Sequence, residues 1–182
     1  VLGFTELLLN GDAPLLPEQQ SHLQRVLSNG NHLHRLLNDL LDLSRIEAGE
    51  LTIESIECAP YVMFHDILSA LQSRAISKNL ILTLKVGNGI PETILTDPTR
   101  LRQILTNLIG NAIDAMAEQR NRQLSFALAT NPDGQLALSV TDSGSGFSAK
   151  ALAHLFEPFF TTKQPGEGLG LGLTISRDIV RE

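Results

Sequence analysis

Gly168-Leu-Gly-Leu-Gly-Leu173 is the stretch of sequence that decides the fold. Glycine alternates with leucine in it, and the chain continues into Thr174 to Val180, where apolar residues recur with the period of a helix. Backbone N–H groups at such a helix start can face phosphate oxygens without a basic side chain. The spacing differs from that of a Walker-type P-loop, which is therefore excluded. The stretch predicts a phosphate-binding turn, and the alternative is a flexible linker, in which glycine rarely alternates with leucine.

A helix expected over Pro98 to Ala117 carries a second part of the site. Asp97 suits its N-cap, and proline suits the first helical position, where a missing N–H costs nothing. Polar side chains recur every three or four residues and so share one face: Arg100, Gln103, Asn107, Asn111 and Asp114. Two asparagines inside a helix cost about 1 kcal/mol relative to alanine. Their carbonyl oxygens suit Mg²⁺, and a solvated helix face is the alternative.

A strand expected near Leu136 to Val140 runs into Thr141-Asp142-Ser-Gly-Ser-Gly146. The glycines permit positive φ and let a flat ring approach the backbone closely. Asp142 is predicted at the floor of the pocket, where its carboxylate accepts from the 6-amino group of adenine but opposes the 6-carbonyl group of guanine. ATP is therefore expected to bind better than GTP. The alternative is an ordinary Asx turn at the end of a strand.

Phe156-Glu-Pro-Phe-Phe-Thr-Thr-Lys163 lies between these two glycine turns and holds three of the eight aromatic residues of the chain. Such a concentration predicts a lid anchored by aromatic side chains. Only Gln164-Pro-Gly-Glu167 separates Lys163 from the second turn, so the lid is short. For Lys163 two roles are open: a contact to the γ-phosphate and a solvated lysine.

In their order along the chain the four segments resemble the N, G1, F and G2 boxes in the ATP-binding domain of sensor histidine kinases, and Leu105-Thr-Asn-Leu-Ile-Gly-Asn-Ala112 matches the N box. The resemblance implies that ATP is bound by Asn107, Asn111, Asp114, Asp142, Gly144, Gly146, Phe159, Phe160, Lys163, Gly168, Leu169, Gly170, Leu171 and Gly172. It also implies Mg²⁺ as a cofactor, with Asn111 as principal ligand and Asn107 as the second metal residue.

Two positions depart from the family's pattern: Asp114 stands where a lysine is frequent, and Leu169 replaces the more usual threonine, as in dicarboxylate-type sensor kinases. The run from Asn111 to Asp114 is also similar to gyrase and mismatch-repair ATPases, which carry a glutamate one turn earlier to activate water. Asn107 occupies that position, and a neutral amide cannot take a proton from water. Phosphoryl transfer to a side chain is therefore favoured over ATP hydrolysis. A nucleotide-binding scaffold without catalysis is the non-enzyme alternative.

Two helices joined by a turn are expected over Val1 to Ala48, with Pro17 starting the second helix and Gly49 at its exit. The second helix carries an apolar stripe with coiled-coil spacing, widened by Leu36 and Leu41: Leu23, Val26, Gly30, Leu33, Leu37 and Leu40. One hairpin cannot cover this much apolar surface. The stripe either packs on the following domain or pairs with a second hairpin in a four-helix bundle, and its spacing favours the dimer.

The expected fold class is α+β, with a dimerisation hairpin at residues 1–49 and a catalytic ATP-binding domain at residues 50–182. The resemblance implies an α/β sandwich of the Bergerat or GHKL type for the second domain. Alternation of apolar and polar residues from Leu51 to Glu57 predicts a strand. Further helices are expected at 61–77, 148–154 and 170–181, and further strands at 80–86, 123–130 and 135–141.

Composition narrows the class of protein. The net charge is -6, and scattered lysines and arginines form no basic face for nucleic acid. No apolar run is long enough to span a membrane, and the single cysteine, Cys58, excludes an internal disulfide. The resemblance implies a cytoplasmic location, with any membrane anchor in segments of the parent protein outside this sequence.

The resemblance implies the kinase core of a two-component system, which transfers the γ-phosphate of ATP to a histidine for relay to an aspartate of a response regulator receiver domain. The hairpin implies a homodimer. The phosphoacceptor histidine is expected upstream of Val1, because Val1 to Leu9 is similar to the stretch that follows the family's H box. The first helix is then incomplete, and closing strands are expected after Glu182. The histidines interpreted as surface or packing residues are His22, His32, His34, His65 and His154.

Overall fold

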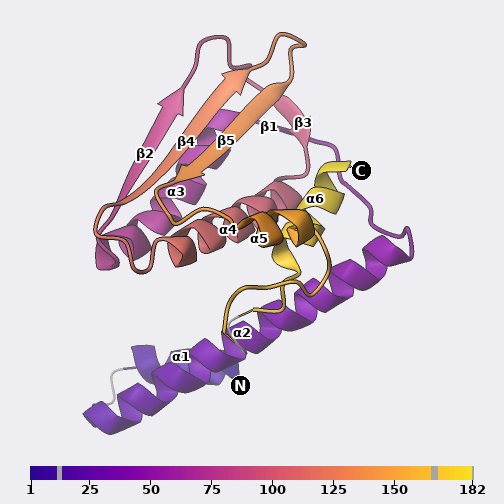
Figure 1. Cartoon of the computed structure of the whole chain (residues 1–182). Coiled ribbons are helices and arrows are strands. Elements are labelled where there is room, and N and C mark those ends of the chain that lie inside the picture. Colours follow the sequence, from indigo (N-terminus) through magenta and orange to yellow (C-terminus); the bar gives the residue numbers. More distant parts are fainter. Residues whose placement is uncertain (12–13, 165–167, 182) are drawn as a thin grey trace.

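The computed structural model describes residues 1–11, 14–164 and 168–181, and Figure 1 shows a helical hairpin followed by a region in which helices cover a sheet. The helices are α1 (Leu2–Asn10), α2 (Pro17–Glu47), α3 (Pro60–Ser77), α4 (Pro98–Ala115), α5 (Ala149–His154) and α6 (Gly172–Arg181). The strands are β1 (Ile56–Cys58), β2 (Leu80–Val86), β3 (Ile94–Thr96), β4 (Arg122–Thr130) and β5 (Leu136–Asp142). Among the described residues, no helix combines the length and apolar character needed to cross a membrane.

Helix α1 lies alongside the first half of α2 (Figure 1). Gly30 permits this close approach, because a Cβ atom at this position would overlap the side chain of Leu2. As predicted, α2 begins with Pro17 at its first turn. Gly49 follows the end of α2 with φ of 67°, a left-handed conformation that glycine adopts without strain.

Most of the apolar stripe on α2 is left unburied by the residues that the structure describes. Only Asp42 and Leu43 of its 31 residues are buried. The exposed apolar side chains on this helix are Val26, Leu33, Leu37, Leu40 and Leu41, and α1 adds Phe4, Leu7 and Leu8. The hairpin therefore leaves apolar side chains exposed at positions spread over most of its length.

The sheet places β4 between β2 and β5, with β2 and β4 parallel and β4 and β5 antiparallel. Alternate residues of β4 are buried, namely Leu124, Phe126 and Leu128. They pack on α3 and α4, which together cover one face of the sheet (Figure 1). The main core thus forms within residues 60–140, and its largest contribution comes from α4, with Leu105, Ile109, Ala112 and Ile113, followed by Met116 at the C-cap.

The structure differs from the predicted elements at three places. The strand predicted from Leu51 is limited to Ile56–Cys58, which pairs with β3, a strand that the sequence does not predict. The preceding residues cross from α2 to α4, and the Glu54 N–H donates to the Asp97 side chain instead of to a neighbouring strand. Helix α4 ends at Ala115 rather than at residue 117. Helix α6 begins two residues later than predicted, because Gly170 adopts φ of 71°.

The C-terminal end of α2 packs on the region that follows it. Leu43 is buried with Leu171, Ile175 and Ile179, and the half-buried Ile46, Leu51, Ile104 and Leu169 surround them. This second cluster holds α2 against α6 and the glycine turn before α6. Both interpretations of the α2 stripe therefore have support, since its last turns pack on the following region and the remainder stays exposed.

Candidate functional site

Helix α4 carries the site and is held firmly at its first turn. The Asp97 carboxylate accepts from the N–H groups of Thr99 at 2.9 Å and Arg100 at 3.0 Å, which forms the predicted N-cap. Burial opposes ionisation of Asp97, but the backbone N–H groups of Arg100, Glu54 and Thr99 outweigh it and lower the pKa of this carboxyl. The polar residues that share one face of α4 form a polar line, which consists of Arg100, Gln103, Asn107, Asn111 and Asp114. The stabilised start of the helix fixes the orientation of this line.

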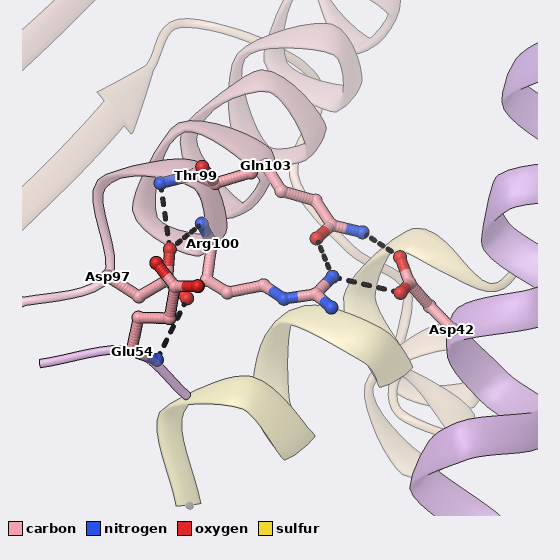
Figure 2. A network of polar contacts seen from close by, with 6 residues as sticks. All are labelled: Asp42, Glu54, Asp97, Thr99, Arg100 and Gln103. Atoms are coloured by element: carbon pink, nitrogen blue, oxygen red, sulfur yellow. Dashed lines mark hydrogen bonds and ion pairs between the residues drawn. The ribbon is translucent and has the colours of Figure 1, made fainter. Parts of the chain in front are cut away.

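Helix α2 contacts the first half of this polar line, as Figure 2 shows. The Arg100 Nη1 atom donates to Asp42 Oδ1 at 2.9 Å, and the Gln103 Nε2 atom donates to Asp42 Oδ2 at 2.7 Å. Arg100 also donates to Gln103 Oε1 at 2.9 Å. The sequence predicts Arg100 and Gln103 on this line but not Asp42 as their partner. The available signal is a carboxylate between Leu41 and Leu43 in a leucine-rich helix, where an unpaired charge would be costly.

The lid contacts the second half of the polar line. Lys163 Nζ donates to Asn111 Oδ1 at 3.0 Å and to Asp114 Oδ2 at 2.6 Å. These contacts bring together the predicted lid lysine and two predicted site residues on α4. Of the two roles open for Lys163, a purely solvated lysine does not fit, because 29% of its side chain is exposed and the ammonium group has two oxygen partners.

Asn107 joins α4 to the glycine turn before α6. Its Nδ2 atom donates to the Gly172 carbonyl oxygen at 3.1 Å and to Ser176 Oγ at 3.3 Å. A Cβ atom at Gly172 would lie 3.2 Å from the Asn107 side chain, so glycine allows this close packing. Asn107 and Gly172, which are both predicted to bind the nucleotide, therefore lie together in the structure.

The turn after β5 packs on the C-terminal end of α4. A Cβ atom at Gly144 would lie 2.8 Å from the Ala115 Cβ atom, which explains why this position requires glycine. Asp142 forms an Asx turn, accepting from the Gly144 N–H at 2.8 Å, and the next glycine, Gly146, has φ of 70°. Asp142 is exposed rather than at the floor of a pocket, and it is the last residue of β5.

The lid is fixed to α6 at its beginning. The Phe156 carbonyl oxygen accepts from Thr174 Oγ1 and from Arg177 Nη1, each at 3.2 Å, and the Arg177 guanidinium lies 5.7 Å from the centre of the Phe156 ring. Phe160 lies directly under Gly170, where a Cβ atom would overlap its carbonyl oxygen. Phe159 is exposed and has φ of 64°, which is uncommon for a residue other than glycine. Residues in this sparsely populated conformation cluster at active sites, ligand clamps and switch regions.

The leucines of the glycine turn lie apart from the polar line. Leu171 is 1% exposed and packs with Leu43 of α2, and Leu169 lies at the edge of the same cluster. Their side chains therefore face the hairpin, and only their backbone groups can serve a phosphate. Gly168 lies near the Lys163 side chain, because a Cβ atom at this position would be 4.0 Å from the Lys163 Cδ atom.

The donor set fits Mg²⁺ bound together with phosphate. Asn111 Oδ1 already accepts from a cationic group, the Lys163 ammonium, and so has the orientation of a cation ligand. Within residues 1–11, 14–164 and 168–181, no three His, Cys, Asp or Glu side chains form a metal site. Mg²⁺ at Asn111 would then take most of its ligands from phosphate oxygens and water, as is usual for this ion.

Two protein families match the chain. Residues 1–49 match the His Kinase A (phospho-acceptor) domain, and residues 96–182 match the histidine kinase-, DNA gyrase B-, and HSP90-like ATPase family. The chain belongs to the sensor histidine kinase family. The α+β fold predicted from the resemblance is thereby confirmed.

Sensor kinases of known function are similar over the whole chain. The signal transduction histidine-protein kinase BarA of Escherichia coli K12 is 33% identical over 194 residues, and the sensor protein GacS of Pseudomonas syringae is 36% identical over 188 residues. Each match covers 100% of this chain but only 20% of the relative. The crystal structure of full-length ShkA in complex with AMPPNP is 30% identical with a TM-score of 0.78, covering 100% of this chain and 37% of that one.

Proposed function

We propose that this chain is the ATP-binding core of a sensor histidine kinase, which transfers the γ-phosphate of ATP to a histidine for relay to an aspartate on a response regulator. The observation that carries the proposal is the convergence of three segments on α4. The turn after β5 contacts Ala115, the lid contacts Asn111, and the glycine turn contacts Asn107. These contacts follow one line of about 12 Å along the helix, calculated from its rise per residue. The name of the ShkA structure, which contains an ATP analogue, supports the same ligand.

In this proposal the base lies at the Ala115 end of the line and the phosphates lie toward Asn107. Asp142 accepts from the 6-amino group of adenine, which selects against guanine. Asn111 and Asn107 hold Mg²⁺, which neutralises charge on the phosphate oxygens when bound. Lys163 leaves Asn111 and contacts the γ-phosphate as the lid closes. The other predicted phosphate contacts, from Gly168 to Gly172, use backbone N–H groups at the start of α6.

The surroundings of Asn107 favour transfer over hydrolysis. A gyrase-like hydrolase needs a carboxylate here to activate water, and Asn107 is neutral. Its amide nitrogen also donates to Gly172 and Ser176, which supports a structural role for this side chain. A protein side chain is therefore the better acceptor for the phosphoryl group.

The partners follow from the exposed hairpin. Leu33 and Leu37 are 58% and 52% exposed, and a second hairpin would cover them in a four-helix bundle. We include in the proposal a homodimer through α1 and α2, a receiver domain as phosphoryl acceptor and a cytoplasmic location. Residues 1–49 form the dimerisation domain and residues 50–182 form the catalytic domain in this proposal.

Nucleotide affinity tests the binding part. We expect Asn111→Ala and Asp142→Ala each to weaken binding of Mg-AMPPNP about tenfold or more, measured by calorimetric titration of the folded chain. Asn88→Ala and Asp133→Ala are matched controls on exposed loops and should bind as the unchanged chain does. Unchanged affinity in both site variants would overturn the assignment of the pocket.

Turnover tests the chemistry. A separate segment with the histidine of an H box is mixed with the chain and γ-labelled ATP. Label on the segment supports the kinase, free phosphate supports a hydrolase, and binding without turnover supports a nucleotide-sensing scaffold. Asn107→Glu restores the carboxylate of the gyrase-like enzymes and is expected to increase release of free phosphate.

A further inference from the structure

One ammonium group joins two side-chain oxygen atoms near the C-terminal end of α4. Lys163 Nζ donates to Asn111 Oδ1 at 3.0 Å and to Asp114 Oδ2 at 2.6 Å. Asn111 and Asp114 are three residues apart, so their side chains are neighbours on one face of the helix. An amide oxygen and a carboxylate oxygen therefore converge on one position, and a positive charge occupies it.

Asp114 lies at a place where a helix disfavours a carboxylate. It is in the last turn of α4, which ends at Ala115 and has no basic residue in that turn. The carbonyl groups at a helix C-terminus give this end a partial negative charge, which attracts cations and repels anions. Asp114 thus adds negative charge to an end that is already negative, and both sources of charge favour a cation beside this side chain.

The ammonium group can be exchanged for another cation. The side chains of Lys163 and Asp114 are 29% and 51% exposed, so water and ions reach the pair. An ion pair with this exposure contributes little to stability, because solvent screens it. In the proposed function Lys163 moves to the γ-phosphate, and Asp114 would then face the phosphate groups without a counter-ion. Negative groups placed in this way repel one another unless a cation lies between them.

We propose that Asp114 is a ligand of Mg²⁺, and that Asn111 and Asp114 exchange the Lys163 ammonium for this ion when ATP binds. Carboxylate and amide oxygens are suitable ligands for Mg²⁺, and phosphate oxygens and water complete its coordination. The exchange keeps the charges balanced, because Lys163 then neutralises phosphate while the ion neutralises Asp114. The exchange on nucleotide binding rests on the proposed function, whereas the cation position between Asn111 and Asp114 does not.

The metal dependence of nucleotide binding tests the role of Asp114. The affinity of the complete 182-residue chain for AMPPNP is measured by calorimetric titration in Mg²⁺ and again in EDTA. The ratio of the two affinities gives the coupling between ion and nucleotide. Asp114→Asn is expected to lower this ratio about tenfold, because it weakens the ion and removes a charge that repels phosphate. Asp114→Lys should lower the ratio further, since it reverses the charge.

Glu118→Gln is the matched control, because it also neutralises an exposed carboxylate close to the end of α4. It should leave the ratio of affinities unchanged. A ratio that is unchanged or higher in Asp114→Asn would overturn the proposal. Equal losses of affinity in Mg²⁺ and in EDTA, in particular, would show that Asp114 acts only by positioning Lys163.

A second experiment needs no nucleotide. Mn²⁺, which accepts oxygen ligands as Mg²⁺ does, is titrated into the chain and followed by electron paramagnetic resonance. Lys163→Met removes the ammonium and should increase the affinity for Mn²⁺ about fivefold or more, because Asn111 and Asp114 are then free to bind it. The gain should be absent when Lys163→Met is combined with Asp114→Asn. Lys150→Met, which removes an exposed lysine of α5, is the control and should not change Mn²⁺ binding.

The two experiments distinguish failure of this site from failure of the proposed function. Equal affinity for Mn²⁺ in Lys163→Met and in the unchanged chain would overturn the shared cation position. A gain that persists in the double variant would overturn the role of Asp114. If the unchanged chain binds no AMPPNP in either solution, the proposed function fails, and the Mn²⁺ titration still decides whether Asp114 belongs to a cation site.

Discussion

Helices α2 and α4 are both amphipathic, but they use their apolar faces differently. Helix α4 buries Leu105, Ile109, Ala112 and Ile113 under the sheet, whereas α2, with 31 residues, buries only Asp42 and Leu43. The apolar face of α4 finds its partner within the chain, because β4 presents alternate buried residues to it. The face of α2 does so only in its last turns. An apolar stripe of similar spacing therefore indicates a core in one helix and an interaction surface in the other.

The largest expected effect compares truncations on these two faces. Ile109→Ala should lower the free energy of unfolding by about 2–5 kcal/mol, because it leaves a cavity in the main core. Leu33→Ala should change it by about 0.5 kcal/mol or less in the monomer, because this side chain is 58% exposed. Urea unfolding, at protein concentrations too low for dimers to form, measures the free energy of unfolding of both variants. Equal losses for the two variants would show that the α2 stripe is already buried within one chain.

A charge introduced on the α2 stripe tests whether this face, unlike that of α4, is an interaction surface. Leu37→Glu should weaken dimer formation about 100-fold, because two copies would each bury a carboxylate in the four-helix bundle. The catalytic region should keep its core, since Leu37 has no buried contact there. Light scattering during size-exclusion chromatography gives the oligomeric state. Ser28→Glu, on the opposite face of α2, is the matched control and should leave the dimer intact.

Periodicity and turn chemistry account for most of the predicted fold. The strand at residues 80–86 is confirmed with both its ends, and α2, α4 and α5 begin within a residue of the predicted positions. Pro17, Pro98 and Ser148 explain this accuracy, because each favours a helix start by a local mechanism. The short strand β3 escaped prediction, since its three residues are set by pairing with the distant Ile56–Cys58.

Contacts between distant segments limit what could be predicted of the site. Residues on one helix face are visible in the sequence, and the line from Arg100 to Asp114 is such a case. The partner of each residue on this line is not visible, because Asp42 and Lys163 come from other elements. The exposure of Asp142 likewise depends on how β5 ends, and the direction of the Leu171 side chain depends on the docking of α2. Local patterns thus supplied the site residues, and tertiary packing divided them between the lid, the glycine turn and the hairpin.

The smallest expected effect concerns the start of α4, where the buried face and the polar line of this helix are both oriented. Asp97→Asn keeps a side chain that can cap the helix but removes its charge, and should lower the free energy of unfolding by about 0.5–1 kcal/mol at pH 7. The folded protein lowers the pKa of Asp97 below its ordinary value of 3.8. Its contribution is therefore complete above the unfolded pKa and is lost as pH falls through the folded pKa.

The difference between Asp97→Asn and the unchanged chain should accordingly be constant from pH 7 to about pH 5 and shrink as the pH falls below 3.8. Urea unfolding at a series of pH values measures it. Asp133→Asn, at an exposed position in a turn, is the control and should show no such dependence. A difference that persists unchanged at pH 3 would mean that the hydrogen-bond geometry of the cap, and not its charge, stabilises α4. In that case the orientation of the polar line would depend on the shape of residue 97 alone, and the lowered pKa would have no part in holding the site.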